Sequence, residues 1–379
     1  MDALNALLDL KLREREQQGL LRQLRTPGEA IDFYSNDYLG LARSSALSAE
    51  IEQQYREGNY LNGSTGSRLL GGNYPLIEDT EHKLAARFKS EGCILFNSGY
   101  SANLAVLSAV PGRGDTILFD NLAHASLKDG ARLSLAKHHS FRHNDPEDLE
   151  RKLAAATGNK FVVLESVYSM DGDLCALEDL IATSRRHNAI IVLDEAHSTG
   201  VMGDGGSGLA IARGLEKQVD IRVYTFGKAM GVHGACVAGS SRLIQYLVNF
   251  SRPFIYTTAP APHQVLSIQC AFDYLDRHLN LQAELQDKVS RYLNGIGSIE
   301  RTNSQSAIQT VICPGNDNVR ALSAHLATRG FDVRPIISPT VPKGTERLRI
   351  CLHTFNSNEE IDRLAEAINT VTPRFRPTA

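Results

Sequence analysis

The sequence VYTFGKAMGVHGA, residues 223–235, decides the fold that we expect and contains the residue on which the expected chemistry depends. An apolar run at 221–226 leads into Gly227 and Lys228, and a glycine-rich continuation follows that an ordinary helix would not contain. The pattern predicts a strand whose end carries a lysine on a tight turn. A single lysine is usually a solvated surface charge, so the segments upstream must decide whether Lys228 has a function.

The segment AIIVLDEAHSTG, residues 189–200, is likewise an apolar run followed by polar residues. Its apolar residues 189–193 predict a buried strand of the parallel type, and Asp194 and His197 follow at the carboxyl end of that strand. Ligands of open α/β sheets bind outside the carboxyl ends of the strands. We therefore expect Asp194, His197 and Lys228 to share one site.

Two further predicted strands are also followed by candidate site residues. A strand at 94–96 enters a turn of small residues that includes Gly99 and Tyr100, and an apolar helix follows. Such a helix start has free N–H groups and a positive dipole end, which suit a phosphate. A strand at 116–119 precedes His124, which we expect at the same edge of the sheet.

Together these residues meet the requirements of pyridoxal 5'-phosphate. The cofactor accepts electrons while its ring nitrogen is protonated, which requires a buried carboxylate, and Asp194 can supply it. Its aldehyde needs an amine for a Schiff base, and Lys228 can supply it. His197 can donate to the ring oxygen, the imidazole of His124 can cover the ring face, and the Thr225 hydroxyl can reach the phosphate.

Eight motifs, in this order and spacing, make the sequence similar to the α-oxoamine synthases: SNDYLGL, GSTGSRLLGGN, NSGYSAN, LAHASL, SMDGD, LDEAHSTGV, TFGKAMG and PTVPKGTERLRI. These are fold-type I pyridoxal-phosphate enzymes that join an amino acid to an acyl thioester with loss of CO2. The resemblance covers nearly the whole chain. It implies a homodimer with shared active sites, in which Thr257 and Thr258 reach the phosphate of the neighbouring subunit. It also implies that Ser169 contacts the ring edge, while Glu165 is structural or holds hydrogen bonds of the site.

The resemblance implies that Arg349, in GTERLRI, binds the α-carboxylate of the amino acid, a task that suits the guanidinium fork. A surface ion pair is the alternative for this arginine. We expect Arg347 to point to the other strand face. Asn36, in SNDYLG, is expected either to assist the carboxylate or to serve only as a turn residue.

Within the family, the sequence resembles most the branch of biotin biosynthesis, which joins L-alanine to a pimeloyl thioester. Ser67 stands where the 5-aminolevulinate branch typically has threonine, and the smaller side chain leaves room for the methyl group of alanine. The resemblance implies that Thr340 contacts the acyl chain and that Arg22 lies near its distal end, although an exposed helix arginine is an alternative for Arg22.

Several other functions remain open. Other branches join glycine to acetyl-CoA, as glycine C-acetyltransferase does, glycine to succinyl-CoA, or serine to a long acyl thioester. A non-catalytic regulator with the pyridoxal-phosphate fold is the alternative from a different class. The acyl carrier, CoA or an acyl-carrier protein, is also open.

The order of strands and helices predicts an α/β protein with a mainly parallel, seven-stranded-type sheet covered on both faces, followed by a smaller α+β domain. The expected domains are residues 1–45, which pack with the small domain, 46–275 and 276–379. In the large domain, strands are expected at 94–96, 116–119, 161–165, 190–194, 221–226 and 235–239. Outside it, we expect helices at about 3–25, 319–329 and 358–370, and strands at 31–34, 307–313, 331–334 and 347–352.

Composition excludes other classes of function. The chain has 379 residues, enough for a sizeable core, and a net charge of −3 that leaves no basic footprint for nucleic acid or acidic membranes. Its six cysteines are scattered without zinc or redox spacing, so we expect core thiols in a reducing compartment. No signal peptide or membrane span is recognisable, which predicts a cytoplasmic protein.

Three motifs resemble sites that we do not expect. GDGGSG at 203–208 fits the dinucleotide fingerprint but does not lie between a strand and a helix. DEAH at 194–197 lacks the phosphate loop that a helicase needs. His138, His139 and His143 lack a carboxylate or cysteine at ligand spacing and are expected to form a polar surface run, so no metal is expected.

Overall fold

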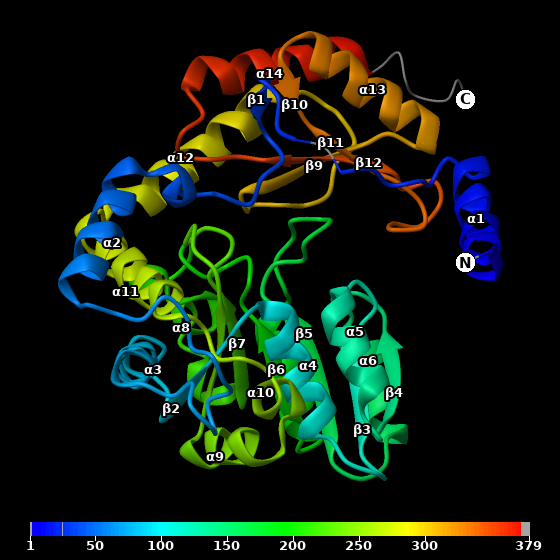
Figure 1. The fold of residues 1–379 in the computed structure, drawn as a ribbon. Helices are drawn as coiled ribbons and strands as arrows, with labels where there is room; N and C mark the ends of the chain where they lie inside the picture. The colour runs from blue at the N-terminus through cyan, green and yellow to red at the C-terminus, as the bar shows by residue number, and fades with distance from the viewer. Residues whose placement is uncertain (1, 25, 373–379) are drawn as a thin grey trace.

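The computed structural model describes residues 2–24 and 26–372, and a seven-stranded sheet lies at its centre (Figure 1). The strand order is β2-β8-β7-β6-β5-β3-β4, with β8 antiparallel to both of its neighbours and all other pairs parallel. The strands are β2 Gly92–Phe96, β3 Thr116–Asp120, β4 Lys137–Phe141, β5 Lys160–Glu165, β6 Ile190–Asp194, β7 Ile221–Thr225 and β8 Ala235–Gly239. This sheet confirms the predicted fold class, and its strands include all six that were expected.

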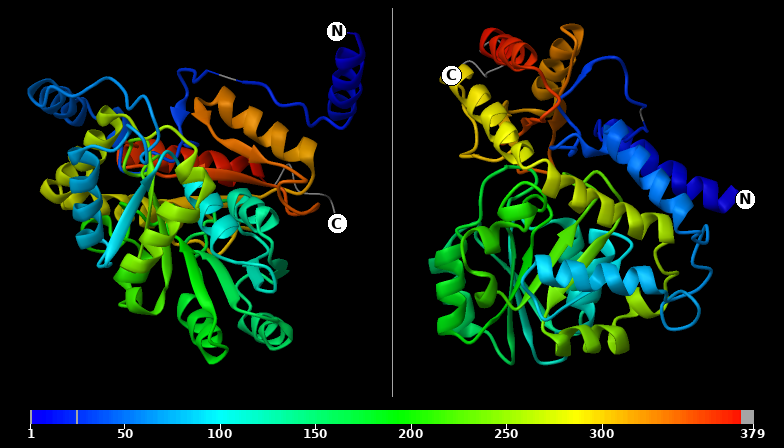
Figure 2. Two further views of the ribbon diagram at one scale, coloured as in Figure 1. Left: turned by 60° about the horizontal axis from the view of Figure 1, so that its bottom comes forward. Right: turned by 90° about the vertical axis from the view of Figure 1, so that its left-hand side faces the viewer.

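Helices cover both faces of this sheet (Figure 2). Along β5, Val163 packs in one apolar cluster with residues of α4 and α5, whereas Leu164 packs in another with residues of α6 and α7. Such burial on both faces explains why the strands appear in the sequence as continuous apolar runs. The helices of this part are α2 Ser45–Glu57, α3 Pro75–Arg87, α4 Gly99–Ala109, α5 Ala125–Leu133, α6 Pro146–Ala155, α7 Leu177–Arg186, α8 Leu209–Ala212, α9 Ser241–Phe250, α10 Arg252–Ile255 and α11 Pro262–Arg277.

Strand β4 was missed in the sequence. In its sequence KHHSF the first three residues are exposed, Ser140 is half-buried and Phe141 is buried. The strand is exposed because β4 lies at the edge of the sheet and pairs only with β3. Without alternating or continuous apolar residues, the segment has no strand signal.

The smaller part of the chain packs over the carboxyl edge of the sheet (Figure 1). Its three-stranded sheet has the order β11-β12-β9, and a parallel pair joins β1 to β10. The elements are β1 Ile31–Asp32, α12 Asn280–Gly295, β9 Ile308–Ile312, α13 Asn316–Thr328, β10 Phe331–Asp332, β11 Arg334–Ile336, β12 Arg347–Cys351 and α14 Asn358–Val371. The expected strand at 331–334 is two strands, because the chain changes partner at the buried Val333. The domain boundaries at 45/46 and 275/276, of which the second falls inside α11, stay predictions.

The N-terminal helix is shorter than expected. Helix α1 spans Asp2–Gln17, and the residue at which its end was predicted, Arg25, lies outside the described residues. The helix stops because Gly19 adopts a left-handed conformation (φ 63°) and Leu20 donates back to the Arg15 carbonyl at 2.7 Å. This Schellman arrangement favours glycine and satisfies the last carbonyls of the helix.

Other expectations can be placed as well. All six cysteines are buried, as predicted for core thiols. Glu195 of the DEAH motif accepts hydrogen bonds from the amides of Leu209 and Ala210, both at 2.9 Å, and so anchors the start of α8. Within the described part of the chain, no helix has the length and apolar character that crossing a membrane requires.

The expectation for His143 is wrong, because this histidine is not part of a surface run. Its Nδ1 lies 3.0 Å from Asp120 and its Nε2 lies 2.6 Å from Asp173. Burial alone would lower the pKa of His143, but hydrogen bonds and charge from the two aspartates outweigh it and raise that pKa to about 10. The charged imidazole therefore ties the end of β3 to the 166–174 loop, which contributes Ser169 to the site.

We predict that His143→Gln destabilises the protein by about 3 kcal/mol near neutral pH, because it leaves the fully buried carboxylate of Asp120 and the mostly buried one of Asp173 without their cation. The folded pKa lies above the unfolded value of 6.5, so the ion pair contributes fully below about pH 6.5 and its contribution is lost as the pH rises through about 10. Denaturant midpoints of wild type and variant should therefore converge with rising pH. His139→Gln, on exposed β4, is the control, and a gap between wild type and His143→Gln that widens with pH would contradict the prediction.

Candidate active site

Two adjacent parallel strands bring the central residues together. Asp194 is the last residue of β6, and Lys228 follows three residues after the end of β7. The Lys228 Nζ lies 2.8 Å from Nε2 of His197, which is 5% exposed. The site thus forms at the carboxyl edge of the sheet, where the sequence predicted it.

The surroundings of Lys228 favour its neutral amine. Burial lowers the pKa of Lys228 to about 8, against the opposing attraction of Asp194 and Glu165. Burial and the nearby lysine charge hold the pKa of His197 well below its usual range. The lysine is consequently a better nucleophile and base at neutral pH than a solvated lysine, and its partner is an uncharged imidazole.

Asn103 holds the carboxylate of Asp194 in place. Its amide donates to Oδ2 of Asp194 at 2.7 Å and to the hydroxyl of Ser126 at 3.0 Å, while the Ala196 amide donates to the other carboxylate oxygen at 2.8 Å. We did not identify Asn103 from the sequence. Its signal was present, because it is a buried amide in the apolar helix GYSANLAVLSA.

His124 caps the start of α5 beside these residues. Its Nδ1 lies 2.8 Å from the Ser126 hydroxyl, and its backbone amide donates to Glu165 at the end of β5. Burial lowers the pKa of His124, whereas burial and the charge of Asp194 raise that of Glu165. A neutral imidazole and a carboxyl group that tends to be protonated therefore line this side of the site.

The start of α4 forms an anion-binding cradle. Ser98 caps the helix, and the N–H groups of Gly99 and Tyr100 have no acceptor within the described ranges. A Cβ added at Gly99 would lie 3.2 Å from the Thr225 hydroxyl, so the two residues line one narrow space. The Tyr100 side chain turns outward and donates to Asp129 at 2.6 Å, so only its backbone serves the cradle.

These groups fit pyridoxal 5'-phosphate. They provide an amine with a lowered pKa, a fixed buried carboxylate, two imidazoles and a helix start for the phosphate. Lys228 lies next to His197 and within the influence of Asp194, Asp194 and Lys228 both act on His124, and Gly99 faces Thr225, three residues before Lys228. The part that each of these residues and Tyr100 plays in holding the cofactor stays a prediction.

Arg349 reaches the site from β12. It is 8% exposed, and it donates to the Ser169 carbonyl at 2.6 Å and to Oδ1 of Asn36 at 2.9 Å. No carboxylate in the described part of the chain pairs with it, so the predicted alternative of a surface ion pair does not apply. A buried guanidinium without a counter-ion suits the carboxylate of a ligand.

The expected orientation of Arg347 is wrong. Residues two apart in a strand lie on the same face, so Arg347 points to the same side as Arg349. It differs in its partner, because it forms an ion pair with Asp171. Arg349 is therefore available to a ligand because Arg347 is held in an ion pair, and not because the two arginines lie on different strand faces.

Other candidates lie elsewhere in the chain. Thr257 and Thr258 lie beside Asn97, the residue before the Ser98 cap, since the Asn97 amide donates to the Thr257 hydroxyl at 3.4 Å and to the Thr258 carbonyl at 3.0 Å. Three predicted substrate contacts make no side-chain hydrogen bond in the described part of the chain and are not joined to Lys228: Ser67, Thr340 and the exposed Arg22.

Comparison with known proteins shows the family of the chain. Residues 29–368 match the family described as aminotransferase class I and II. The chain belongs to this family of pyridoxal-phosphate enzymes and, within it, to the α-oxoamine synthases, which confirms the resemblance found in the sequence.

Individual relatives have more specific names within the α-oxoamine synthases. A protein of Chromohalobacter salexigens named 8-amino-7-oxononanoate synthase is 38% identical over 97% of this chain and 97% of its own. The solved serine palmitoyltransferase of Sphingomonas wittichii is 32% identical, with a TM-score of 0.85 over 91% of this chain and 88% of its own. The solved 8-amino-7-oxononanoate synthase of Francisella tularensis is 27% identical, with a TM-score of 0.78 over 91% of this chain and 98% of its own.

We predict that Asp194→Asn keeps the fold and the covalent attachment of the cofactor at Lys228, but lowers exchange of the alanine α-proton by at least about 100-fold. An amide cannot keep the ring nitrogen protonated. Proton exchange is followed by NMR in deuterated buffer, and the attachment is mapped by borohydride reduction and peptide mass. Asp317→Asn, whose side chain is 99% exposed, is the control. Undiminished exchange in Asp194→Asn would remove this role.

Proposed function

We propose that the protein condenses L-alanine with a pimeloyl thioester to give 8-amino-7-oxononanoate, a step of biotin biosynthesis. The observation that carries the proposal is the unpaired, buried Arg349 in the same site as Lys228, which provides for an amino acid held by its carboxylate beside an amine base. The choice of alanine and pimeloyl rests on the relatives named 8-amino-7-oxononanoate synthase and on the small side chain of Ser67.

The overall reaction is a decarboxylative condensation. A bond forms between the α-carbon of alanine and the carbonyl carbon of the thioester, the C–S bond breaks, and the thiol leaves with a proton. The carboxylate of alanine leaves as CO2, and a proton takes its place. The acyl carrier is either CoA or an acyl-carrier protein.

Each part of the reaction is assigned to particular residues of the chain. When bound, pyridoxal 5'-phosphate supplies the electron sink for the α-carbanion. Arg349 and Asn36 hold the carboxylate, and the Lys228 amine removes the α-proton and later returns one. Asp194 keeps the proton on the ring nitrogen. His124 faces the reacting side and donates to the carboxylate or to the new keto oxygen.

We also propose a homodimer with shared sites. Three observations support it. Ser67, Thr340 and Arg22 make no side-chain hydrogen bond within the described part of the chain. The 257–258 segment lies beside Asn97, just before the start of α4, and Leu69, Leu70 and Tyr256 are large exposed apolar side chains close in sequence to Ser67 or to this segment. Sedimentation of the cofactor-loaded protein tests the assembly. The cytoplasmic location stays a prediction.

Serine palmitoyl transfer is the second candidate, because the serine palmitoyltransferase of Sphingomonas wittichii matches this chain at 32% identity. We predict that alanine with pimeloyl thioester gives the 8-amino-7-oxononanoate mass, while glycine and serine with acetyl, succinyl or palmitoyl thioesters give no product. Product mass spectrometry of each pair decides this. A colourless protein that cannot be reconstituted with the cofactor would instead favour the alternative of a non-catalytic regulator with the pyridoxal-phosphate fold.

A substitution tests the carboxylate site. We predict that Arg349→Lys raises the KM for alanine about 10- to 100-fold, because lysine loses the fork that binds both carboxylate oxygens. The KM for the thioester should change much less. Arg329→Lys, an exposed arginine of the same part of the chain, is the control, and an unchanged KM for alanine in Arg349→Lys would contradict the assignment.

A further inference from the structure

Three partners hold the guanidinium of Arg349, and one of them is a thiol. Its Nε donates to the Ser169 carbonyl at 2.6 Å, and one terminal nitrogen, Nη2, donates to Oδ1 of Asn36 at 2.9 Å. The other terminal nitrogen, Nη1, donates to Sγ of Cys351 at 3.0 Å. The thiol is therefore one of the groups that set the orientation of the guanidinium plane.

These bonds leave a pair of donors free on Arg349. A guanidinium has one N–H on Nε and two on each terminal nitrogen. The three bonds use one N–H of each nitrogen. One N–H on Nη1 and one on Nη2 remain, and the two oxygens of a carboxylate can accept from two such donors in parallel bonds.

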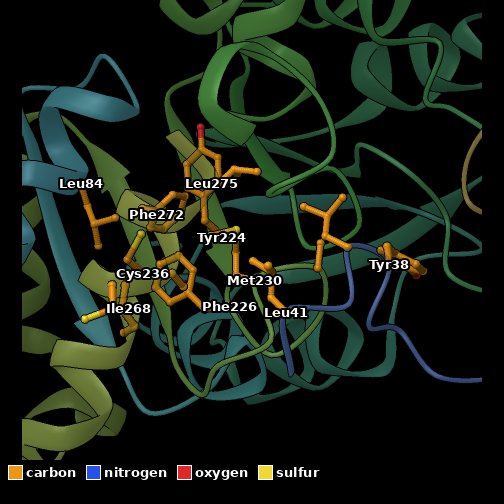
Figure 3. Packing of buried hydrophobic residues seen from close by; sticks show 14 of the residues in the cluster. Tyr38, Leu41, Leu84, Tyr224, Phe226, Met230, Cys236, Ile268, Phe272 and Leu275 are labelled. Carbon is orange, nitrogen blue, oxygen red and sulfur yellow. The ribbon is translucent and has the colours of Figure 1, made fainter. Parts of the chain in front are cut away.

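Cys351 is fixed beside Arg349 by the strand and by packing. It is the last residue of β12 and lies two residues after Arg349, so the two side chains leave the strand on the same face. Cys351 is 0% exposed and belongs to the apolar cluster in which Tyr38 and Leu41 also pack (Figure 3). Its amide donates to the Phe33 carbonyl at 2.8 Å. The sulfur is consequently held next to Nη1 and away from solvent.

The thiol orients the guanidinium without cancelling its charge. Burial raises the pKa of Cys351, although Arg349 lies beside it, so the thiol keeps its proton. A carboxylate at this position would form an ion pair with Arg349, as Asp171 does with Arg347. Because a neutral sulfur is only a weak acceptor, the charge of Arg349 stays available to a ligand.

We propose that Cys351 is a positioning residue whose sulfur holds Nη1 of Arg349, so that both terminal nitrogens face the carboxylate of the amino acid. Without this acceptor the guanidinium can turn, and the bond to one carboxylate oxygen weakens. Lys228 takes part in none of the three hydrogen bonds of Arg349, so its bond to the cofactor breaks none of them. The assignment rests on the proposed function for the identity of the ligand.

Cys351→Ser and Cys351→Ala separate orientation from packing. The two new side chains have nearly the same size, but only serine can accept from Arg349. In the cofactor-loaded enzyme, Cys351→Ala should raise the KM for alanine about 5- to 10-fold, the effect of one lost hydrogen bond, while kcat and the KM for the thioester change less than about twofold. Cys351→Ser should keep the KM for alanine within about twofold of the wild type.

Propionate has the carboxylate of alanine but no amine, so it probes the same donors without the cofactor. Calorimetric titration of the full-length, cofactor-free protein should show propionate binding weakened about 5- to 10-fold in Cys351→Ala and in Cys351→Val. Cys351→Val fills the space of the thiol but has no acceptor, so it tests the proposal even if Cys351→Ala does not fold. Cys270→Ala, which removes another fully buried thiol, on α11, is the control and should bind propionate as the wild type does.

An equal loss of alanine and propionate binding in Cys351→Ser and Cys351→Ala would indicate a packing role and overturn the proposal. Wild-type propionate binding in both Cys351→Ala and Cys351→Val would also overturn it. If serine preserves propionate binding and alanine and valine weaken it, but no amino ketone forms with any substrate pair, the positioning role is supported and the proposed function is overturned.

Discussion

The structure depends on burying the amine of Lys228 while keeping it reactive. Burying an ammonium ion is costly, and the cost falls when carboxylates lie nearby or when the group gives up its proton. Asp194 and Glu165 provide the carboxylates, burial favours the neutral amine, and His197 faces Lys228 as an uncharged partner. Because β5, β6 and β7 are neighbouring parallel strands, their carboxyl ends deliver all of these groups to one edge.

The second half of the site comes from the N-terminal segment and the small sheet, which act as one unit. The Cys351 amide donates to the Phe33 carbonyl at 2.8 Å, and the Thr354 amide donates to the Tyr38 carbonyl at 3.0 Å. His353 lies 3.0 Å from the Ser35 carbonyl. These bonds fix Asn36 and Tyr38 beside Arg349, although more than 300 residues separate them in the chain.

Some local features could not be predicted, for identifiable reasons. The edge strand β4 is polar because one side of it has no neighbour. His143 stands in a polar run, but Asp120 and Asp173, which bury and charge it, are distant in sequence. The end of α1 depended on a single glycine, Gly19, whose left-handed conformation outweighed the favourable helix composition beyond it.

The sequence by itself determined the α/β class, the positions of six sheet strands, the cofactor and the residues at the strand ends. These follow from local patterns, since an apolar run that ends in a polar turn is readable from neighbouring residues. Only the tertiary structure decided which arginine lacks a counter-ion, that Asn103 holds Asp194, and that Asn36 lies beside Arg349. Those properties are pairings between distant segments, and a linear pattern does not contain the partner.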